Sequence, residues 1–409
     1  MIIFDKMIHK IKKNIILFDA SEVRGNLLPM TFTRPVADLR VGILTIREKW
    51  ERMLCGKYSY LTADYLQEKF PMHEHDDNLF IAGNVCPTVE LVSKIESLNQ
   101  GEVIKSSDGY LLAFRGGIED FNSCNYANEI KLDCDCIKIK MLYDIFMENH
   151  RGIVEDFALL TKNRTSQSLS DTNTIIGNPI DADGNSLIFI EEGAVVEGAM
   201  LNVKNGPIYV GCNAEVMEGS CLRGPIALCD NAVINMGARV YGATTLGPYC
   251  KVGGEVNNVV MMGYSNKAHD GFLGNAVVGE WCNIGGGSSA SNLKNDYTEI
   301  KLWNYPAHRF LRTGLQFCGL IMGDHSKVGV NCMFNTATVL GVGVNIHGSG
   351  FPRNFVASFS EGSASGFTDV PLSKFFDIAQ RMMTRRGLVL SEIDMRIFES
   401  IHAIADNYK

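Results

Sequence analysis

The feature that most constrains the fold is a period of six residues in the aliphatic side chains. Eight consecutive positions at this spacing are aliphatic: Val210, Val216, Leu222, Leu228, Ile234, Val240, Leu246 and Val252. The positions two residues earlier are mostly small: Ile208, Ala214, Ser220, Ile226, Ala232, Ala238, Thr244 and Cys250. Helix faces recur every 3.6 residues and strands alternate every two, so six fits neither. The period is typical of a parallel β-helix, in which three six-residue units close one triangular coil.

The period is interrupted twice. It resumes in a new phase at Val278 and again from Met322 to Ile346. We interpret the interruptions, 253–277 and 291–321, as loops that leave the coil, and loops on a rigid scaffold often carry function. The first contains His269 in the stretch SNKAHDGFLG. A β-sandwich is the alternative fold, but its irregular loops do not keep eight strands in phase.

The regions on either side have other patterns. Residues 1–165 alternate apolar strands with helix-like segments, which predicts an α/β domain. The polar stretch 161–174 is the expected linker. After residue 352 the period is lost, and two helices are expected at 371–387 and 391–408, the second capped by Ser391. The predicted organisation is therefore 1–165, a β-helix over 172–352, and a helical cap over 353–409.

Charge and composition argue against some classes of partner and location. The chain has 46 acidic and 38 basic residues, a formal charge of −8, and no long basic block. We therefore expect no nucleic-acid or membrane partner. Asp5 and the segment 9–13 interrupt any apolar core of a signal peptide, and scattered cysteines suit reduced thiols, so a cytoplasmic location is expected.

The period of six resembles the left-handed parallel β-helix of the hexapeptide-repeat acyltransferases. Within it, NKAHDGFLGNAVVGEWCNIGGGSSASNL (266–293) is similar to the acetyltransferase domain of the bacterial bifunctional enzyme that makes UDP-N-acetylglucosamine. The resemblance implies that His269 is the catalytic base and that Glu255 supports it. It also implies that Asn283 and Asn292 position the substrate, and that the protein is a homotrimer.

Other positions of this resemblance concern substrate and cofactor. Phe272 stands where the family has a sugar-contacting tyrosine, and Asn257 where it has a substrate-binding lysine, so both are candidate substrate contacts. Lys267 and Lys294 are candidates for binding phosphate. The candidate contacts with acetyl-CoA are Gly285, Gly286, Gly287, Val330 and Gly348, and a backbone N–H of the glycine run is expected to stabilise the oxyanion.

The N-terminal half carries a second resemblance. NLLPMTFTRPVADLRVGILTI (26–46) is similar to a segment of the sugar-1-phosphate nucleotidyltransferases. It implies that Arg34 binds phosphate and that Asp19 and Asn84 help to hold Mg²⁺. The family's glycine-rich nucleotide loop is replaced by FDASEVRGN. With the order of the two domains, these features resemble the variant two-domain enzyme found mostly in Bacteroidetes-type bacteria.

Three functions follow from these observations. The first is transfer of an acyl group, most simply acetyl from acetyl-CoA, to an amino sugar phosphate or nucleotide sugar, with His269 as base. The second is nucleotidyl transfer by the N-terminal half alone. The third is a non-catalytic scaffold that binds nucleotide sugars. His325 and His347 lie near expected turns and are interpreted as structural.

Overall fold

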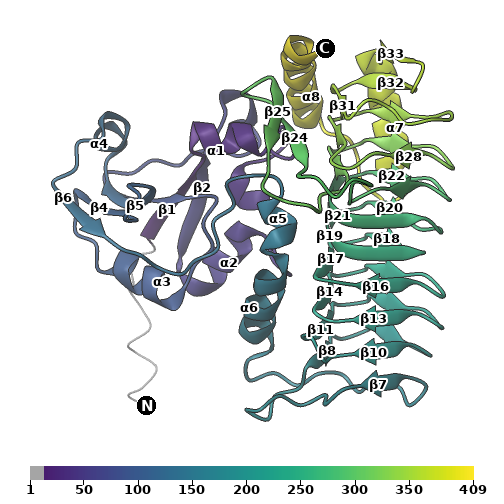
Figure 1. Cartoon of the computed structure of the whole chain (residues 1–409). Helices are drawn as coiled ribbons and strands as arrows, with labels where there is room; N and C mark the ends of the chain where they lie inside the picture. The colour runs from purple at the N-terminus through teal and green to yellow at the C-terminus, as the bar shows by residue number, and fades with distance from the viewer. Residues whose placement is uncertain (1–12) are drawn as a thin grey trace. The chain divides into compact units, whose positions relative to one another are not determined.

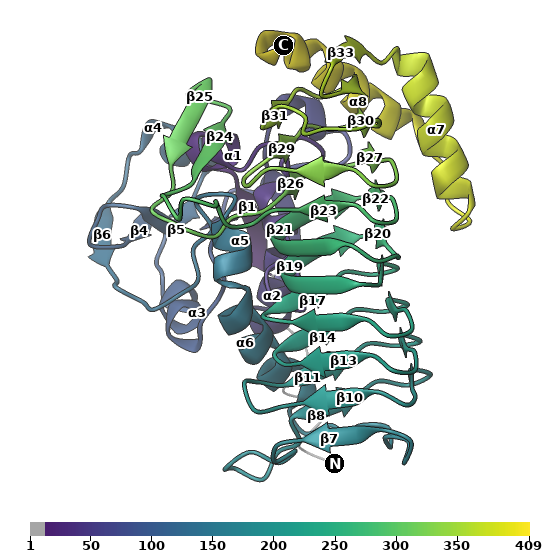
Figure 2. The same cartoon turned by 45° about the vertical axis from the view of Figure 1, so that its right-hand side comes forward.

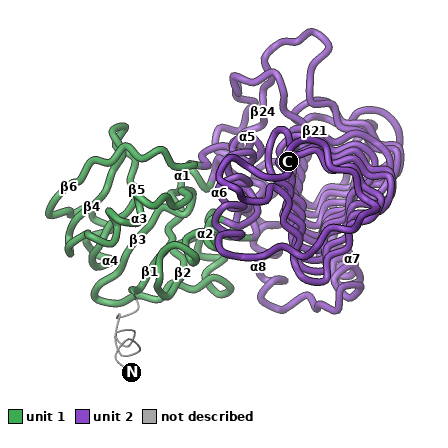
Figure 3. Tube along the Cα trace, turned by 90° about the horizontal axis from the view of Figure 1, so that it is seen from below, with its two compact units in different colours: residues 1–24, 34–38, 46–138 green, residues 25–33, 39–45, 139–409 purple. Residues whose placement is uncertain are grey.

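A computed structural model describes residues 13–409, and these divide into two compact units (Figure 3). Unit 1 comprises the chain up to Arg24 together with 34–38 and 46–138. Unit 2 comprises 25–33, 39–45 and 139–409, so the segment 139–165 groups with the β-helix. Most of the segment used above to argue against a signal peptide lies in residues 1–12, outside the described part. Within residues 13–409, none of the helices has both the length and the apolarity to cross a bilayer.

Unit 1 is built on a six-stranded mixed sheet with the order β2-β1-β3-β5-β4-β6. Its strands are β1 (Lys13–Phe18), β2 (Gly56–Leu61), β3 (Asn78–Ala82), β4 (Glu102–Lys105), β5 (Leu111–Gly116) and β6 (Asn128–Lys131). Its helices are α2 (Ile46–Met53), α3 (Val89–Glu96), capped by the Thr88 hydroxyl, and α4 (Ile118–Ser123); α1 (Ser21–Asn26) crosses the unit boundary. The apolar strand β1 pairs in parallel with β2 on one side and with β3 on the other. The chain order of the strands therefore changes direction at β1. Parallel sheets usually bind ligands beside such a point, at the carboxyl ends of the strands.

The core of unit 2 is a parallel β-helix whose coils stack as successive rungs (Figures 1 and 2). The first face contains β7 (Thr174–Ile176), β10 (Met200–Asn202), β13 (Cys221–Arg223), β16 (Arg239–Tyr241), β23 (Ser289–Ala290) and β28 (Met333–Phe334). The second face contains β8 (Ile188–Ile190), β11 (Ile208–Val210), β14 (Ile226–Leu228), β17 (Thr244–Leu246), β26 (Ile321–Met322), β29 (Val339–Leu340) and β31 (Phe355–Val356). The third face contains β9 (Val195–Val196), β12 (Glu215–Val216), β15 (Val233–Ile234), β18 (Lys251–Val252), β20 (Asn266–Lys267), β22 (Asn283–Ile284), β27 (Lys327–Val328), β30 (Asn345–Ile346) and β32 (Ser360–Ser363).

The fold class predicted from the period of six is confirmed. Neighbouring coils pair in parallel and in register, as Val210 does with Leu228, and the periodic aliphatic residues fill one continuous core. The second and third faces continue past residue 352 through β31 and β32, and β33 (Gly366–Asp369) ends the sheet with an antiparallel pairing.

The expectation that 253–277 leaves the coil is wrong. β19 (Glu255–Gly263) and β21 (Phe272–Glu280) each run along the first face, turn a corner and continue along the second. Val216 pairs with Ile234, 18 residues on, whereas Val252 pairs with Lys267, only 15 residues on. The period therefore changes because the coil is shorter. By contrast, 291–320 does leave the coil and forms the antiparallel hairpin of β24 (Lys301–Asn304) and β25 (Arg309–Arg312).

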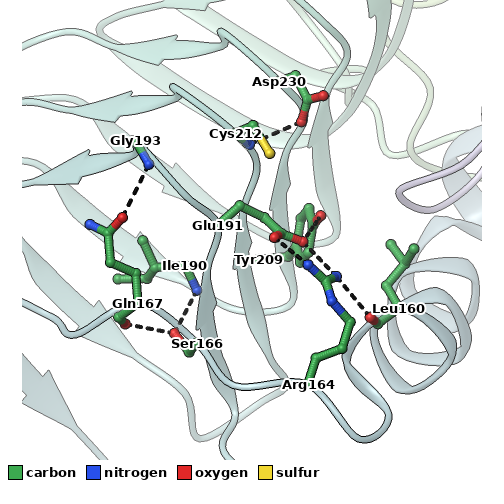
Figure 4. Close-up of polar contacts among 10 residues, drawn as sticks. All are labelled: Leu160, Arg164, Ser166, Gln167, Ile190, Glu191, Gly193, Tyr209, Cys212 and Asp230. Carbon is green, nitrogen blue, oxygen red and sulfur yellow. Dashed lines mark hydrogen bonds and ion pairs between the residues drawn. The ribbon is translucent and has the colours of Figure 1, made fainter.

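Helices cover part of the second face. They are α5 (Asp144–Met147) and α6 (Asn149–Thr161). Ile153, Phe157 and Leu160 of α6 form a second apolar core with outward side chains of the coils, such as Phe189. The segment after α6 is fixed to the first coils by Arg164, whose guanidinium binds both carboxylate oxygens of Glu191, at 2.8 and 2.6 Å (Figure 4).

The C-terminal helices are present as predicted. They are α7 (Leu372–Thr384) and α8 (Glu392–Ala405). Ser391 and Asp394 form a capping box at the start of α8. Phe375 of α7 and Phe398 of α8 pack their rings on each other and on His325, which joins the helices to the β-helix.

Candidate functional site

His269 lies on a turn that joins the third face to the first. We call these turns, at 268–271, 285–288 and 329–332, the glycine corner. The His269 side chain is exposed, and within residues 13–409 neither ring nitrogen has a hydrogen-bond partner. The coils are bound to one another here, because the N–H of Gly287 donates to the carbonyl of Asp270 and that of Asn331 donates to the carbonyl of Gly286, both at 2.8 Å.

Gly286 leaves space beside the imidazole. A Cβ atom built on Gly286 would lie 3.3 Å from the Cβ and 3.6 Å from the Cγ of His269. The N–H groups of Gly285 and Gly287 bind carbonyls of neighbouring coils, whereas that of Gly286 has no acceptor within the described chain. Gly286, whose N–H is unbonded, is therefore a close neighbour of the candidate base. The geometry suits a reaction in which an oxyanion forms beside the histidine.

The other predicted cofactor contacts lie along the same corner. Val330 is on the next coil after Gly286 and is 70 % exposed. Gly348 is one coil further, where its carbonyl accepts a hydrogen bond from the Cys332 thiol, at 3.8 Å. The structure thus brings His269, the glycine run, Val330 and Gly348 onto four consecutive coils, although they span 80 residues of sequence.

Lys267 lies inside the β-helix. Its inward position corresponds to that of Val252 on one neighbouring coil and Ile284 on the other, and it is 2 % exposed. Its amine donates hydrogen bonds to the carbonyl oxygens of Gly253, at 2.8 Å, and His269, at 2.6 Å. Burial lowers the pKa of this amine to about 8. The amine predicted to bind phosphate therefore holds the backbone of the His269 turn.

Three predicted residues lie on the outer side of the first face. Glu255 and Phe272 are register neighbours there, and Asn257 is two residues along. The Glu255 carboxylate accepts a hydrogen bond from the Tyr241 hydroxyl, at 2.7 Å, and lies 3.8 Å from the guanidinium of Arg239. In the described chain no hydrogen bond joins Glu255 to His269, so the implied pairing of these two side chains stays a prediction.

The remaining predicted residues of the β-helix lie apart. Asn283 is on the outer side of the third face, in register with Asn266. Asn292 lies where the first face turns into the second, and its amide donates to Asn275, at 2.8 Å. Lys294 is in the 291–320 excursion, where its amine donates to the carbonyl of Glu299, at 2.8 Å. Their roles in substrate binding stay predictions.

In unit 1, Asp19 and Asn84 follow β1 and β3 and so lie at the same edge of the sheet. Asp19 accepts hydrogen bonds from the Val36 N–H, at 3.0 Å, and from the Thr62 hydroxyl, at 2.6 Å, and lies 3.7 Å from Arg24. Burial raises the pKa of Asp19 to about 6, against the lowering effect of Thr62, Val36 and Arg24. The amide oxygen of Asn84 accepts a hydrogen bond from Tyr110, at 2.6 Å.

This edge is a poor fit for Mg²⁺ in the described conformation. Magnesium binds through carboxylate oxygens, and here one carboxylate has both oxygens hydrogen-bonded beside an arginine. Among residues 13–409, no cluster of three Asp, Glu, His or Cys side chains suits a metal. Where the family has its glycine-rich loop, α1 follows β1. Arg34, the candidate phosphate ligand, is only 6 % exposed.

The sequence did not predict a cavity beside Asn283. It lies between the third face and the end of α7, and Lys251, Trp281 and Arg385 are among its lining residues. The only signal was the run RMMTRRG, which also fits an ordinary basic helix end.

Three comparisons with known proteins bear on these sites. Residues 15–165 match the family model described as sugar nucleotidyl transferase. The bifunctional protein GlmU of Trichodesmium erythraeum is 27 % identical over 143 residues, covering 34 % of this chain and 25 % of that protein. The bifunctional sugar-1-phosphate nucleotidylyltransferase/acetyltransferase of Sulfurisphaera tokodaii is 27 % identical over 165 residues, covering 40 % of each. The bifunctional protein GlmU of Synechococcus elongatus is 25 % identical over 179 residues, covering 42 % of this chain and 30 % of that protein.

The chain therefore spans a quarter to two fifths of the length of these relatives. A solved structure of the polysialic acid O-acetyltransferase OatWY is similar with a TM-score of 0.21 and 14 % identity, covering 49 % of this chain and 86 % of the other. The sequence matches support a relationship to the sugar nucleotidyl transferases and their bifunctional relatives.

Proposed function

We propose that this chain is a transferase of nucleotide-sugar chemistry whose β-helix moves an acyl group from acyl-CoA to the amine of an amino sugar phosphate or nucleotide sugar. The observation that carries the proposal is the position of His269, exposed on the glycine corner beside the unbonded N–H of Gly286. The names of the bifunctional relatives, one of which includes acetyltransferase, support it. Acetyl-CoA is the simplest donor.

The reaction needs a base and an oxyanion donor. The sugar amine attacks the thioester carbonyl and forms the new C–N bond, and a ring nitrogen of His269 takes the proton that the amine loses. The carbonyl oxygen becomes an oxyanion, which the Gly286 N–H stabilises. Collapse of the intermediate breaks the C–S bond, and the CoA thiolate leaves and takes up a proton. No covalent acyl-enzyme forms.

The test is release of free thiol from acetyl-CoA in the presence of glucosamine-1-phosphate and a panel of amino-sugar nucleotides. We expect His269→Ala to lower kcat by at least about 100-fold with at least one acceptor, the scale of general-base catalysis. His347→Ala is the matched control, because this exposed histidine lies three coils further on and only approaches Glu361, at 3.9 Å. Full activity of His269→Ala, or no turnover with any acceptor, would contradict the proposal and favour the binding scaffold.

Nucleotidyl transfer by the N-terminal half is the second candidate, because residues 15–165 match that family. The product would be a nucleotide sugar made from a sugar 1-phosphate and a nucleoside triphosphate, with release of pyrophosphate. Measurement of pyrophosphate release across the four nucleoside triphosphates tests it. The poor fit of Asp19 and Asn84 to Mg²⁺ favours instead a half that binds a nucleotide sugar without reaction.

The implied homotrimer and cytoplasmic location are part of the same proposal. In a trimer, a neighbouring subunit would complete the site at the exposed glycine corner, where Val330 presents its apolar side chain. Sedimentation of the purified chain measures this state directly.

A further inference from the structure

A cavity of about 570 Å³ lies in unit 2, and neither His269 nor the glycine run is among its lining residues. Its lining residues come from the third face and from the C-terminal end of α7. Its size is typical of small-molecule sites. Its lining includes five cationic side chains and no acidic one: Lys251, Lys327, Arg381, Arg385 and Arg386, together with Tyr264, Asn266, Ala268, Trp281, Asn283 and Met382.

The five cations are not equivalent. Lys327 is bound within the coil, since its amine donates to the carbonyls of Trp281, at 2.8 Å, and His325, at 2.7 Å. Arg386 donates to the carbonyl of Tyr249, at 3.3 Å. Lys251 and Arg385 have no partner among the described residues, and Arg381 only approaches Asp377, at 3.8 Å, with both side chains exposed. Lys251 and Arg385 therefore bring positive charge that no ion pair within residues 13–409 neutralises, whereas Asp324 acts electrostatically on Lys327. A helix C-terminus attracts cations, which accounts for the arginines of α7 but not for Lys251 of β18.

The aromatic side chains favour an anion here. Tyr249, Tyr264, Trp281 and His325 occupy the same turn on successive coils, each with a left-handed backbone, and their rings stack. The Trp281 ring lies 4.3 Å from that of Tyr264 and 6.1 Å from that of His325. Since both ring faces are covered, a ligand meets the edge of Trp281. Ring edges carry positive partial charge, so they attract anionic oxygens, and a base does not stack on this ring.

One residue of the lining, Asn266, has a side-chain acceptor without a hydrogen-bond donor. The side-chain oxygen of Asn266 is buried and has no partner within residues 13–409. A buried acceptor left unpaired costs free energy, and phosphate oxygens cannot satisfy it. A hydroxyl group can, after a rotation of the Asn266 carboxamide that turns this oxygen toward the cavity. Asn283, its register neighbour on the next coil, offers a second amide at the same wall.

We infer that this cavity binds a phosphate ester that also carries free hydroxyls. The phosphate oxygens lie between Lys251 and Arg385, and a hydroxyl donates to Asn266. Two sources share this chemistry, a nucleoside diphosphate as in a nucleotide sugar and the phosphorylated nucleotide end of CoA. The inference does not depend on acyl transfer, because binding is measured without turnover.

Calorimetric titration of the full chain with UDP, CoA and inorganic pyrophosphate, each separately, tests the inference. We expect at least one nucleotide to bind and Lys251→Ala and Arg385→Ala each to weaken it about tenfold, the usual effect of one charge-assisted hydrogen bond. Preference for UDP or for CoA identifies the source. Asn266→Ala should weaken the nucleotide but leave pyrophosphate binding unchanged, because pyrophosphate has no hydroxyl donor for the asparagine.

Lys204→Ala is the matched control, an exposed lysine of the same β-helix far from this cavity in sequence and in coil. The inference is overturned if none of the three probes binds at millimolar concentration, or if Lys204→Ala weakens binding as much as Lys251→Ala does. His269→Ala should bind the nucleotide like the wild type. If this variant loses turnover but still binds the nucleotide, the two proposals are separated, because only acyl transfer depends on His269. If the wild type binds a nucleotide but turns over no acceptor, the cavity proposal stands and the acyl-transfer proposal fails.

Discussion

The amine of Lys267 donates a hydrogen bond to the carbonyl oxygen of His269, at 2.6 Å, from a position inside the β-helix core. Aliphatic side chains occupy this inward position on the neighbouring coils, where Val252 and Ile284 stand. A buried lysine costs free energy unless its amine is bonded. Here the amine is bonded to the turn that carries the candidate base, which makes Lys267 a positioning residue for His269.

Replacement of Lys267 by methionine keeps the length of the side chain and removes its donor. We expect kcat for acyl transfer to fall about tenfold or more, because a displacement of the base by 1 Å is enough to lower rates by up to about 100-fold. KM should change little, since the amine faces the core and does not contact substrate. Steady-state kinetics with an acceptor that the panel identifies measure both parameters.

Val216→Ala is the control for general loosening of the coil. Val216 is fully buried at the same inward position of the third face, three coils earlier. It should lower the free energy of unfolding by about 1–3 kcal/mol and leave kcat unchanged at a temperature where the protein is folded. Equal loss of kcat in both variants would mean that Lys267 acts only through stability.

Two lysines predict how stability depends on pH: Lys267, which is buried, and Lys327, which is half-buried. Burial lowers the pKa of Lys267 and of Lys327 to about 8, whereas an unfolded lysine titrates near about 10.4. Between these values the unfolded chain binds more protons than the folded one, so the free energy of unfolding contributed by these groups rises with pH. Below pH 8 both states are protonated and the contribution is constant.

Urea unfolding at pH 7.5 and pH 9.5 measures this effect. The wild type should gain more stability over the interval than the double variant Lys267→Met/Lys327→Met. Cysteine and tyrosine side chains also titrate in this range, but they are common to both proteins and cancel in the comparison. Parallel pH profiles for the two proteins would show that the amines are not held in this environment.

Gly286 and Gly285 should respond differently to an added side chain. The nearest atoms to a Cβ on Gly286 would be those of the His269 side chain, at 3.3 Å, whereas a Cβ on Gly285 would lie 2.4 Å from the backbone of Gly329. Gly286→Ala should therefore be nearly neutral, and Gly286→Val should lower kcat sharply while the melting temperature is kept. Gly285→Ala should lower the melting temperature itself. Thermal unfolding and kinetics of the three variants distinguish these effects.

Much of the β-helix could be predicted from the sequence, because its inward residues repeat at a fixed distance. The prediction failed at 253–277 for a physical reason. There, β19 and β21 bend around a corner without a separate turn, which shortens the coil, and Lys267 replaces the aliphatic residue that would have continued the pattern. A polar residue at an inward position looked like the end of the core, although its amine makes two hydrogen bonds to backbone carbonyls of the coil.

The candidate site was predictable only where it is contiguous. His269 and the glycine run lie within 19 residues, 269–287, and a motif of that length is visible in the sequence. The cavity at the third face draws Lys251, Asn266 and Asn283 from three coils and Arg385 from α7. No spacing rule connects these positions, since only the stacking of coils and the return of α7 bring them together.

The carboxyl group of Asp19 provides the last prediction. Burial raises its pKa to about 6, above the value of about 3.9 for an unfolded aspartate. The folded chain therefore binds more protons between pH 3.9 and 6, and the contribution of this group to stability falls as pH rises through that window. At pH 7.5 the buried carboxylate is charged, which lowers the free energy of unfolding. An asparagine at this position would still accept a hydrogen bond from the Val36 N–H and would carry no charge.

Asp19→Asn should accordingly raise the midpoint of thermal unfolding at pH 7.5 and have less effect at pH 4.5. Thr62→Val is the companion variant, because it removes the hydroxyl that donates to the carboxylate, at 2.6 Å, without changing the charge, and it should lower the midpoint. The sheet edge fits Mg²⁺ poorly. Addition of about 5–10 mM MgCl₂ should therefore shift the midpoint of thermal unfolding equally in the wild type and in Asp19→Asn. If Mg²⁺ raises the midpoint of the wild type but not that of Asp19→Asn, Asp19 gives up these hydrogen bonds to bind the metal. Nucleotidyl transfer would then become the stronger hypothesis for the N-terminal half.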